Sequence, residues 1–506
     1  MKAINHKTSM HACRESDERV VPTKCANQEG SEEEPRASAE RMEGSRSTKR
    51  NTEKTHTHRT QGRESVSQGL GGVGEAARRD KKQKFTALLH HVSVDLLRAS
   101  YEALNKSAAP GVDGVTWQQY GEGVEERIKD LHDRVHRGAY RAQPSRRRYI
   151  AKSDGRQRPL GIAALEDKIV QQATVTVLNQ IYEEDFLGFS YGFRPGRSQH
   201  QALDALWVGL RRKRVNWVLD ADIRGFFDNM DHEWLMKMVE YRIADPRIQR
   251  LIRKWLKAGV IEDEQWQESL IGTPQGAVIS PLLANIYLHY VFDLWVNQWR
   301  RREAQGDVIV VRYADDIVLG FEHRRQAEAF LEQLRERMKK FGLELHSEKT
   351  RLIEFGRYAV QNRGKRGQGK PDTFDFLGFT HSCGKTRKGG WFTVKRTTSK
   401  KRWRNKLQAI GEELRRRMHA KFAETGKWLR TVVQGYFNYH AVPGNFAALK
   451  SFRREVERLW WRVLRRRSQR RRIGWTRFVQ IADQLLPKAR ILHPPPWVRL
   501  AAIYSR

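Results

Sequence analysis

The spacing of apolar residues predicts a polar leader followed by a chain that mixes helices and strands. Residues 1–80 are Ser, Thr, Glu, Arg and Gly in mixed order with almost no aliphatic periodicity, which is typical of a disordered segment. Helical spacing begins in 84–104, and mixed patterning continues to about residue 380. Apolar residues then recur at helical spacing in 429–437 and 456–464. We therefore expect a disordered leader, a mixed body and a helical C-terminal region.

Two short apolar runs flank a pair of carboxylates. DVIVV and IVLGF have the length and β-branched content of buried strands, and YADD between them, residues 313–316, is short enough for a tight hairpin turn. A third apolar run, NWVLDAD, ends in Asp220 and Asp222 and precedes a helical pattern that begins near Asp228. Another helix is expected to begin near Ser198.

Composition adds a strong positive charge to this picture. With 506 residues, 39% of them hydrophobic, the chain is long enough for two or three domains with sizeable cores. The 95 Lys and Arg against 59 Asp and Glu leave +36, and +26 of this lies in 381–506. Such a surplus suits a nucleic acid, although a ribosomal-type or merely adhesive basic protein is an alternative on charge alone.

Cysteine and hydropathy patterns argue against a disulfide-stabilised, Cys-zinc or membrane-spanning protein. The three Cys residues contain no CxxC pair, so neither a disulfide framework nor a Cys-based zinc site is predicted, and a reducing compartment is expected. No apolar run approaches the roughly 18 residues of a membrane-spanning helix.

The carboxylates predict a metal site. An Asp pair at a turn usually reflects turn chemistry, but a strand-end Asp brought beside it makes a cluster that needs cations to stay ionised. Carboxylate ligands favour Mg²⁺. Two such ions about 3.5 to 4 Å apart activate a 3′-hydroxyl and stabilise a leaving pyrophosphate.

Several blocks, taken in order, carry a resemblance to a known family. YADD and DIRGFFD (222–228) resemble the palm motifs of reverse transcriptases. Further blocks narrow the match to group II intron-encoded reverse transcriptase/maturases, of the bacterial type that lacks an HNH endonuclease domain. They are AAPGVDGVTW (108–117), YIAKSDGRQRPLGIAALEDKIVQQA (149–173), SYGFRPGRSQHQAL (190–203), GTPQGAVISPLLANIYL (272–288), FGLELHSEKT (341–350) and FDFLGF (374–379).

The resemblance covers roughly 84–480 and implies an architecture. It implies an α+β right-hand polymerase, with fingers and an antiparallel palm sheet in 81–380. An all-α basic thumb/maturase domain follows in 381–480, and 481–506 would be a short tail without an endonuclease.

The resemblance also assigns roles at the palm. Asp222 and Asp315 match metal ligands, with Asp316 as the accompanying carboxylate and the Ile223 carbonyl as a further ligand. The implied cofactor is a pair of Mg²⁺ ions, with Mn²⁺ as a substitute. Lys349 matches a proton donor to pyrophosphate, with a plain surface lysine as the alternative.

Substrate-binding residues follow from the same blocks. Lys152 and Arg158 match residues that clamp the incoming triphosphate, for which the fixed donor fork of Arg is well suited. For Lys152 the alternative is a solvated loop charge. Phe227 matches the aromatic that excludes ribonucleotides, with a core aromatic as the alternative, and Gln275 matches a residue near the incoming nucleotide.

The residues predicted to contact nucleic acid are arginines. Arg194 and Arg197 in GFRPGRS are predicted to grip template phosphates, with an arginine-rich turn before a helix as the alternative. Trp460 and Trp461 are predicted to pack in a core. In the thumb, the residues predicted to bind RNA are Arg453, Arg454, Arg458, Arg465, Arg466, Arg467, Arg470, Arg471 and Arg472.

The resemblance implies an RNA-directed DNA polymerase encoded by a group II intron, which copies intron RNA into cDNA and assists splicing and mobility. The implied partners are group II intron RNA, a DNA target or primer and deoxynucleoside triphosphates, without a membrane, in the bacterial cytoplasm near the nucleoid. Two alternatives are a polymerase-inactive splicing cofactor and a reverse transcriptase recruited to host defence. The complete set of predicted active-site residues argues against the first, and the maturase-like segment 429–480 argues against the second.

Overall fold

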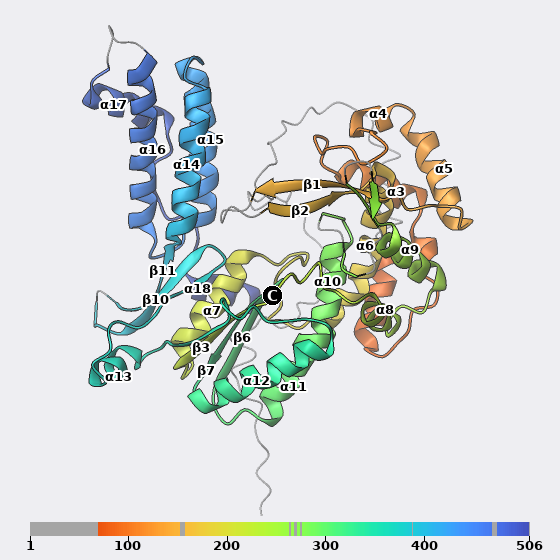
Figure 1. The fold of residues 1–506 in the computed structure, drawn as a ribbon, viewed down its shortest axis with the longest axis horizontal. Helices are drawn as coiled ribbons and strands as arrows, with labels where there is room; N and C mark the ends of the chain where they lie inside the picture. The colour runs from red at the N-terminus through yellow and green to blue at the C-terminus, as the bar shows by residue number, and fades with distance from the viewer. Residues whose placement is uncertain are drawn as a thin grey trace, which may run out of the picture.

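The computed structural model describes residues 69–151, 157–262, 265–267, 271–273, 276–386, 388–467 and 473–504. Helices and strands are mixed in an N-terminal lobe and in a body built on a central sheet, and a bundle of helices follows (Figure 1). In Figure 1 the lobe and the bundle rise on opposite sides above the central sheet. The leader predicted for 1–80 lies outside the described residues as far as residue 68.

The leader is predicted to extend to residue 80, but its last part is helical. Residues 69–79 form a helix, and Leu70, Val73 and Ala77 on one of its faces are buried in the main hydrophobic core. Three apolar positions at helical spacing are enough to dock a helix on a preformed surface, although they are too few to stand out within a polar segment.

The N-terminal lobe joins helices to a small sheet of order β2-β1-β4-β5. Strand β1 pairs antiparallel with β2 and parallel with β4. The elements are η1 (Leu89–His91), α3 (Val94–Ala103), α4 (Trp117–Gly121), α5 (Val124–His136), β1 (Ser145–Ala151), β2 (Gln157–Ile162), α6 (Leu165–Asp185), α8 (His232–Glu240), α9 (Pro246–Lys257), β4 (Val260–Glu262) and β5 (Gln265–Gln267).

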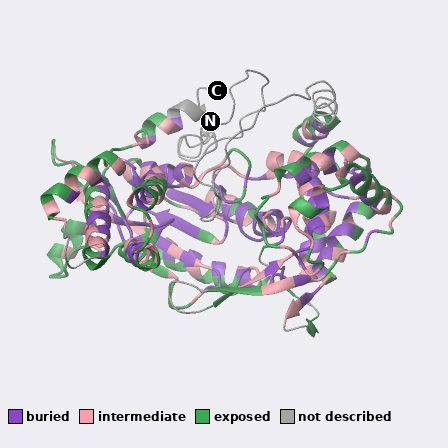
Figure 2. Ribbon diagram, turned by 90° about the horizontal axis from the view of Figure 1, so that it is seen from above, coloured by how far each residue is buried: buried purple, intermediate pink, exposed green. Residues whose placement is uncertain are grey.

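The central sheet has the order β6-β7-β3-β8, and all its pairings are antiparallel. Its strands are β3 (Trp217–Asp222), β6 (Val308–Tyr313), β7 (Asp316–Phe321) and β8 (Arg351–Glu354). β-Branched and aromatic side chains fill both faces of these strands, and Figure 2 shows the strands as the buried centre of the molecule. The predicted antiparallel sheet is therefore confirmed.

Helices cover this sheet and fix its position. Helix α7 (Gln199–Arg212) packs against β6 and β7, while α12 (Arg324–Lys340) packs against β3 and β7. Ser198 is the N-cap of α7 in a capping box with Gln201, as predicted. Helix α8 begins at His232 with Asp231 as its N-cap, not near Asp228 as predicted, because residues 224–228 form turns.

One long helical segment contains a change of helical type. Helices α10 (Ser280–Leu288) and α11 (Leu294–Arg302) are joined without a break by a π-helix, η2 (His289–Asp293). A π-turn inserts an extra residue per turn and so rotates the side chains that follow it. Asp293, at its end, is fully buried.

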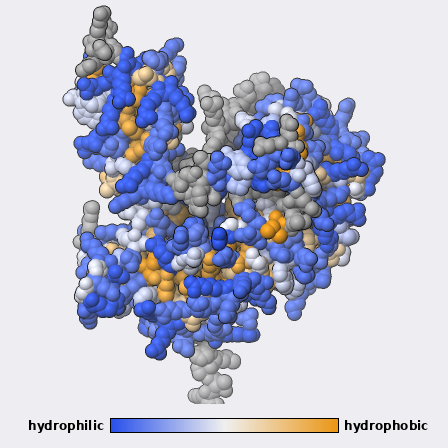
Figure 3. Space-filling view, viewed as in Figure 1, coloured by the Kyte–Doolittle hydropathy of each residue, from blue (hydrophilic) through white to orange (hydrophobic). Residues whose placement is uncertain are grey.

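The all-helical character predicted from residue 381 begins later than expected. After α13 (Ala359–Lys365), strands β9 (Phe374–Phe376), β10 (Phe379–Lys385) and β11 (Phe392–Thr398) form an antiparallel sheet. The bundle then contains α14 (Lys400–Arg416), α15 (Phe422–His440), α16 (Phe446–Arg467) and α17 (Trp475–Leu485), with a hydrophobic core of its own. Figure 3 shows a mostly hydrophilic bundle surface with one apolar stripe.

Most of the predicted short tail, residues 481–506, follows α17 and contacts the central body. Helix α18 (Pro496–Tyr504) returns to the central body and packs against α7. Arg499 Nε lies 2.9 Å from Asp204 Oδ2 on α7, and the His493 ring stacks on His200 with centroids 3.8 Å apart. This segment therefore ties the bundle back to the central body.

Candidate active site and nucleic-acid interface

Strand register brings the three predicted carboxylates to one end of the central sheet. Tyr313 pairs with Asp316, which leaves Ala314 and Asp315 as a two-residue hairpin loop, and Asp222 is the pairing partner of Asp316 on the neighbouring strand. Partners directly opposite on antiparallel strands have Cβ atoms about 4.5–5.5 Å apart. The predicted juxtaposition of Asp222 with the YADD turn is thus confirmed.

Burial, followed by repulsion from neighbouring carboxylates, raises the pKa values of Asp315, Asp316 and Asp220. Burial by surrounding protein, followed by the charges of Asp315, Asp222 and Asp220, raises the pKa of Asp316 to about 7. Asp316 as a whole residue nevertheless remains exposed to water. Burial also raises the pKa of Asp315 and brings the pKa of Asp220 to about 6. A cation placed among these groups would relieve this repulsion.

A lysine already provides one positive charge at this cluster. The turn after Leu345 is closed by the amides of Lys349 and Thr350, which both donate to the His346 carbonyl, and it places Lys349 Nζ 2.5 Å from Asp222 Oδ2. Within the described ranges, no group of three or more His, Cys, Asp or Glu side chains is arranged to hold a metal ion. The donors themselves are hard carboxylate oxygens, which suit Mg²⁺.

The predicted backbone ligand has a fixed position. Ile223 is buried and forms an isolated antiparallel bridge with Leu345. The flanking hydrogen bonds run from the Arg224 amide to the Glu344 carbonyl and from the His346 amide to the Asp222 carbonyl, both at 2.8 Å. The segment 344–346 therefore fixes the backbone on both sides of Ile223.

Two of the four predicted nucleotide-binding residues can be placed. Arg158 is exposed on β2, and its positive charge opposes the rise in the pKa of Asp315, so the two groups interact. The Phe227 ring packs edge-on against Phe226 at 5.4 Å and Phe193 at 6.4 Å between centroids, and it is half-buried. Lys152 and Gln275 lie outside the described residues.

Arg194 does not lie where a template phosphate could reach it. Its side chain is buried, pairs with Glu183 through Nε and Nη2, and donates from Nη1 to the carbonyls of Leu187 and Ser190 at 2.9 and 2.8 Å. The predicted phosphate contact is therefore wrong, because these internal partners engage the guanidinium. Arg197 is half-buried with its guanidinium 5.8 Å from the Tyr191 ring centroid.

The arginines predicted to bind RNA in the bundle fall into two groups. Arg454, Arg465, Arg466 and Arg467 project into water from α16. Arg453, by contrast, pairs with Glu457 at 3.1 Å and Asp483 at 2.5 Å, and Arg458 pairs with Glu455 at 2.5 Å. Arg470, Arg471 and Arg472 lie outside the described residues.

Both bundle tryptophans pack, as predicted. Trp460 is 1% exposed and its ring stacks on Phe422 at 4.7 Å between centroids. Trp461 donates through its indole nitrogen to the Ile473 carbonyl at 3.1 Å and packs edge-on against Trp475.

Sequence reasoning overlooked two residues beside the carboxylates. Phe193 is 47% exposed with φ +58°, and its ring faces Phe227. Arg312 is fully buried in β6, where a charged residue interrupts the run VIVVRY. A lone arginine in a buried strand was the available signal, because such a charge requires a buried partner.

The described helices include none that is both long enough and apolar enough to cross a membrane.

Comparisons with known proteins agree with this geometry. Residues 150–381 match the family model described as reverse transcriptase (RNA-dependent DNA polymerase). The chain is 36% identical over 297 residues to Protein YkfC of Escherichia coli strain K12, covering 51% of this chain and 78% of that protein. It is 33% identical over 303 residues to the group II intron-encoded protein LtrA of Lactococcus lactis subsp. cremoris, covering 57% of this chain but only 50% of LtrA.

A eukaryotic relative extends the set. The putative COX1/OXI3 intron 2 protein of Saccharomyces cerevisiae is 32% identical over 182 residues, covering 36% of this chain and 21% of that protein. The matched region contains all the strands of the central sheet, and the relatives include intron-encoded proteins. The chain therefore belongs to the family of group II intron-encoded reverse transcriptases and maturases.

Proposed function

We propose that this chain copies group II intron RNA into cDNA at Asp222, Asp315 and Asp316. The N-terminal lobe would serve as fingers, the central sheet as palm and the bundle as thumb. The observation that carries the proposal is the pairing of Asp222 with Asp316 across two strands, with Asp315 in the adjoining loop. These carboxylates, with the Ile223 carbonyl, would hold two Mg²⁺ ions, for which Mn²⁺ could substitute. Bound metal would lower the pKa of the primer 3′-hydroxyl and neutralise charge on the leaving pyrophosphate.

Neighbouring residues would orient the triphosphate of the incoming nucleotide and donate a proton to the leaving pyrophosphate. Arg158 extends from β2 on the side of Asp315, where its donor fork suits phosphate oxygens. Lys349 is exposed and donates to Asp222, so its ammonium is within reach of the cluster and could release a proton to pyrophosphate. Phe227, held by the Phe226 and Phe193 rings, would limit the space beside the sugar 2′ carbon.

The bundle would bind intron RNA and the template-primer duplex. Residues 381–506 carry +26 of the net charge, and Arg454, Arg465, Arg466 and Arg467 face water along one helix. Exposed arginines suit phosphate contacts and shape-based RNA recognition. The protein's substrates would place its work in the bacterial cytoplasm.

Primer extension on poly(rA) with an oligo(dT) primer tests the proposed catalytic centre. Asp315→Ala should abolish extension, whereas Asp228→Asn, which removes an exposed carboxylate from the same segment, should retain most of it. Both variants should bind RNA as the unmodified protein does. Extension by Asp315→Ala within tenfold of the unmodified protein would rule out the assignment.

A further inference from the structure

The loop that carries Asp315 has a backbone conformation that its sequence does not favour. Ala314, the first of the two loop residues, has φ +55° and is 6% exposed. The favoured two-residue hairpin loops need positive φ at this position and therefore usually place Gly, Asn or Asp there. An Ala side chain in this region is strained, so surrounding contacts must hold the loop in place.

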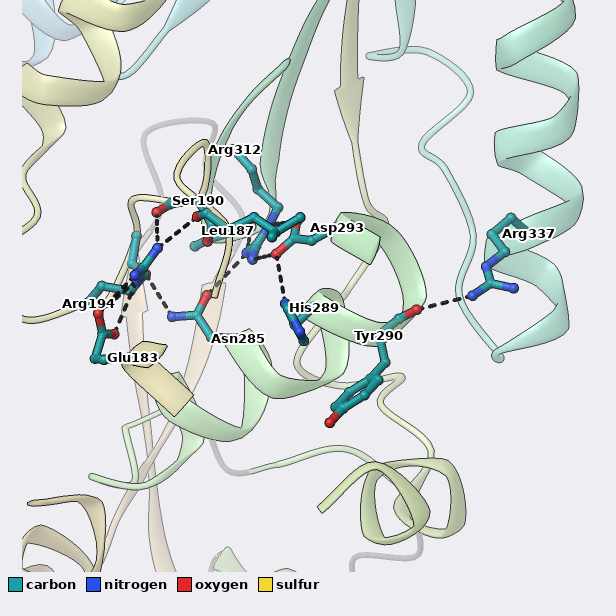
Figure 4. Close-up of polar contacts among 12 residues, drawn as sticks. Glu183, Leu187, Ser190, Arg194, Asn285, His289, Tyr290, Asp293, Arg312 and Arg337 are labelled. Atoms are coloured by element: carbon teal, nitrogen blue, oxygen red, sulfur yellow. Dashed lines mark hydrogen bonds and ion pairs between the residues drawn. The ribbon is translucent and has the colours of Figure 1, made fainter. Parts of the chain in front are cut away.

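Arg312 provides a direct contact to this loop. Its Nη1 donates to the Ala314 carbonyl and to Asn285 Oδ1, each at 3.1 Å. Its Nε and Nη2 pair with the two carboxylate oxygens of Asp293 at 2.7 and 2.5 Å (Figure 4). All three of these side chains are at most 1% exposed. We call Arg312, Asp293 and Asn285 the turn clamp.

The two partners of Arg312 are themselves fixed. Asp293 ends the π-helix, and the guanidinium of Arg337 on α12 donates to the carbonyls of Tyr290 and Val291 within that helix at 3.1 and 2.9 Å. Figure 4 shows Arg337 reaching this helical turn from α12 and Asp293 facing Arg312. The π-turn thus sets the direction from which Asp293 approaches the sheet.

A second set of contacts supports the loop through segment 187–194. Asn285 Nδ2 donates to the Gly192 carbonyl at 2.7 Å, and a Cβ added to Gly192 would lie 2.3 Å from the Ala314 nitrogen. Only Gly therefore allows this segment to lie directly against the loop. Arg194 holds the same segment by its bonds to the Ser190 and Leu187 carbonyls, which explains why its side chain points inward.

We propose that the turn clamp positions the Ala314–Asp315 backbone so that Asp315 and Asp316 keep the orientation toward Asp222 that nucleotidyl transfer requires. The inference rests on the proposed catalytic centre. A buried Arg-carboxylate pair by itself often adds little net stability compared with apolar residues of similar size. In addition to its pairing with Asp293, Arg312 donates through Nη1 to the carbonyl of Ala314 in the loop. This hydrogen bond would hold the loop in place, which a residue that only fills a core would not do.

A matched pair of substitutions separates positioning from general stability. Arg312→Lys keeps a positive charge near Asp293 but loses the planar fork that also reaches Ala314. The control is Arg242→Lys: Arg242 is equally buried, lies 2.9 Å from Asp185, and donates to the carbonyls of Asp80 and Gln83 at 3.0 Å, all outside the carboxylate cluster. Both substitutions should lower the melting temperature to a similar degree.

The variants should differ in catalysis. At saturating primer-template and nucleotide, Arg312→Lys should lower kcat for extension by about tenfold or more with KM for nucleotide little changed, because a small displacement of catalytic groups has effects of this size. Arg242→Lys should keep kcat within about threefold. Hydrogen exchange at the amides of 313–316 should accelerate only in Arg312→Lys, which gives a readout independent of activity.

A second variant keeps the test decisive if Arg312→Lys folds poorly. Ala314→Gly removes the strain at φ +55°, so adding it to Arg312→Lys should restore part of the lost kcat, while adding it to Arg242→Lys should not raise activity. Equal kcat losses in Arg312→Lys and Arg242→Lys, or an unchanged kcat in Arg312→Lys, would overturn the proposal. Absence of extension by the unmodified protein would instead count against the catalytic centre itself.

Discussion

Two arginines of the central body are buried and paired, whereas many arginines of the C-terminal bundle project into water. Arg312 and Arg194 lie inside the central body with carboxylates and carbonyls as partners. Arg465, Arg466 and Arg467 extend from the end of α16 without burial. A buried charge must have a defined partner and so fixes geometry, while an exposed charge is free to meet a ligand's phosphates. The two regions should therefore respond differently to substitution.

The largest expected effect separates copying from RNA binding. Asp222→Asn or Asp316→Ala should lower cDNA synthesis by about a thousandfold or more, because losing a metal ligand removes several kcal/mol of transition-state stabilisation. Both variants should still stimulate splicing of the cognate intron, which needs only shape and positive charge. Primer-extension and splicing rates should be measured for each variant. Parallel loss of both activities would point to one shared RNA-binding step.

Next in size is the salt dependence of RNA binding by the bundle. Replacing Arg465, Arg466 and Arg467 by Ser should flatten the plot of log affinity against log salt by about two units, at roughly 0.7 per phosphate contact on a single strand. The matched control is Arg301, Arg302 and Arg325, which are equally exposed on α11 and α12 of the central body. Filter binding of single-stranded RNA between low and high salt measures both slopes. Equal changes in the two triple variants would show that the contacts are not localised to the bundle.

A smaller effect concerns two histidines where the bundle meets the rest of the chain. Burial and the charge of Arg396 lower the pKa of His381 to about 3, and burial with Arg402 and His200 lowers the pKa of His440 to about 3. In the unfolded chain each imidazole binds a proton near pH 6.5, whereas in the folded chain it does so only near pH 3. Their contribution to the free energy of unfolding is therefore highest above pH 6.5 and decreases as the pH falls toward about 3.

Chemical denaturation at pH 7.5 and 5.0 measures this loss. Each histidine should cost about 2 kcal/mol of unfolding free energy between these values. His440→Gln should reduce the pH-dependent loss of unfolding free energy by the contribution of one histidine. His323→Gln, at an exposed position on the central body, should leave that loss unchanged. A His440→Gln variant with the full pH dependence would contradict the assignment.

The smallest effects distinguish two neighbouring arginines on one helix. Arg453→Ala leaves Glu457, which is 6% exposed, without its partner at 3.1 Å and should lower the free energy of unfolding by about 2 kcal/mol. Arg454→Ala removes an exposed side chain and should change it by less than about 0.5 kcal/mol while weakening RNA binding. Thermal melts and RNA titrations of the two variants should therefore rank in opposite order.

Local patterns in the sequence determined the parts of the site that depend on strand length and alternation. The two apolar runs around YADD predict a tight hairpin turn, and the run ending in Asp222 predicts a strand, which the structure pairs beside that hairpin. The amphipathic spacing of α15 and α16 likewise specified their buried faces, including Leu429 and Trp460. These features are encoded within a few residues, because side chains alternate in strands and recur every three or four residues in helices.

Tertiary structure alone decided which partner each arginine meets. Arg194 and Arg453 resemble RNA-binding arginines in the sequence, yet Glu183 and Asp483 engage them internally. The return of α18 to α7 depends on Arg499 meeting Asp204 from nearly 300 residues away. Whether a charged side chain is paired or free depends on folding contacts distant in sequence, and spacing along the chain carries no information about those contacts.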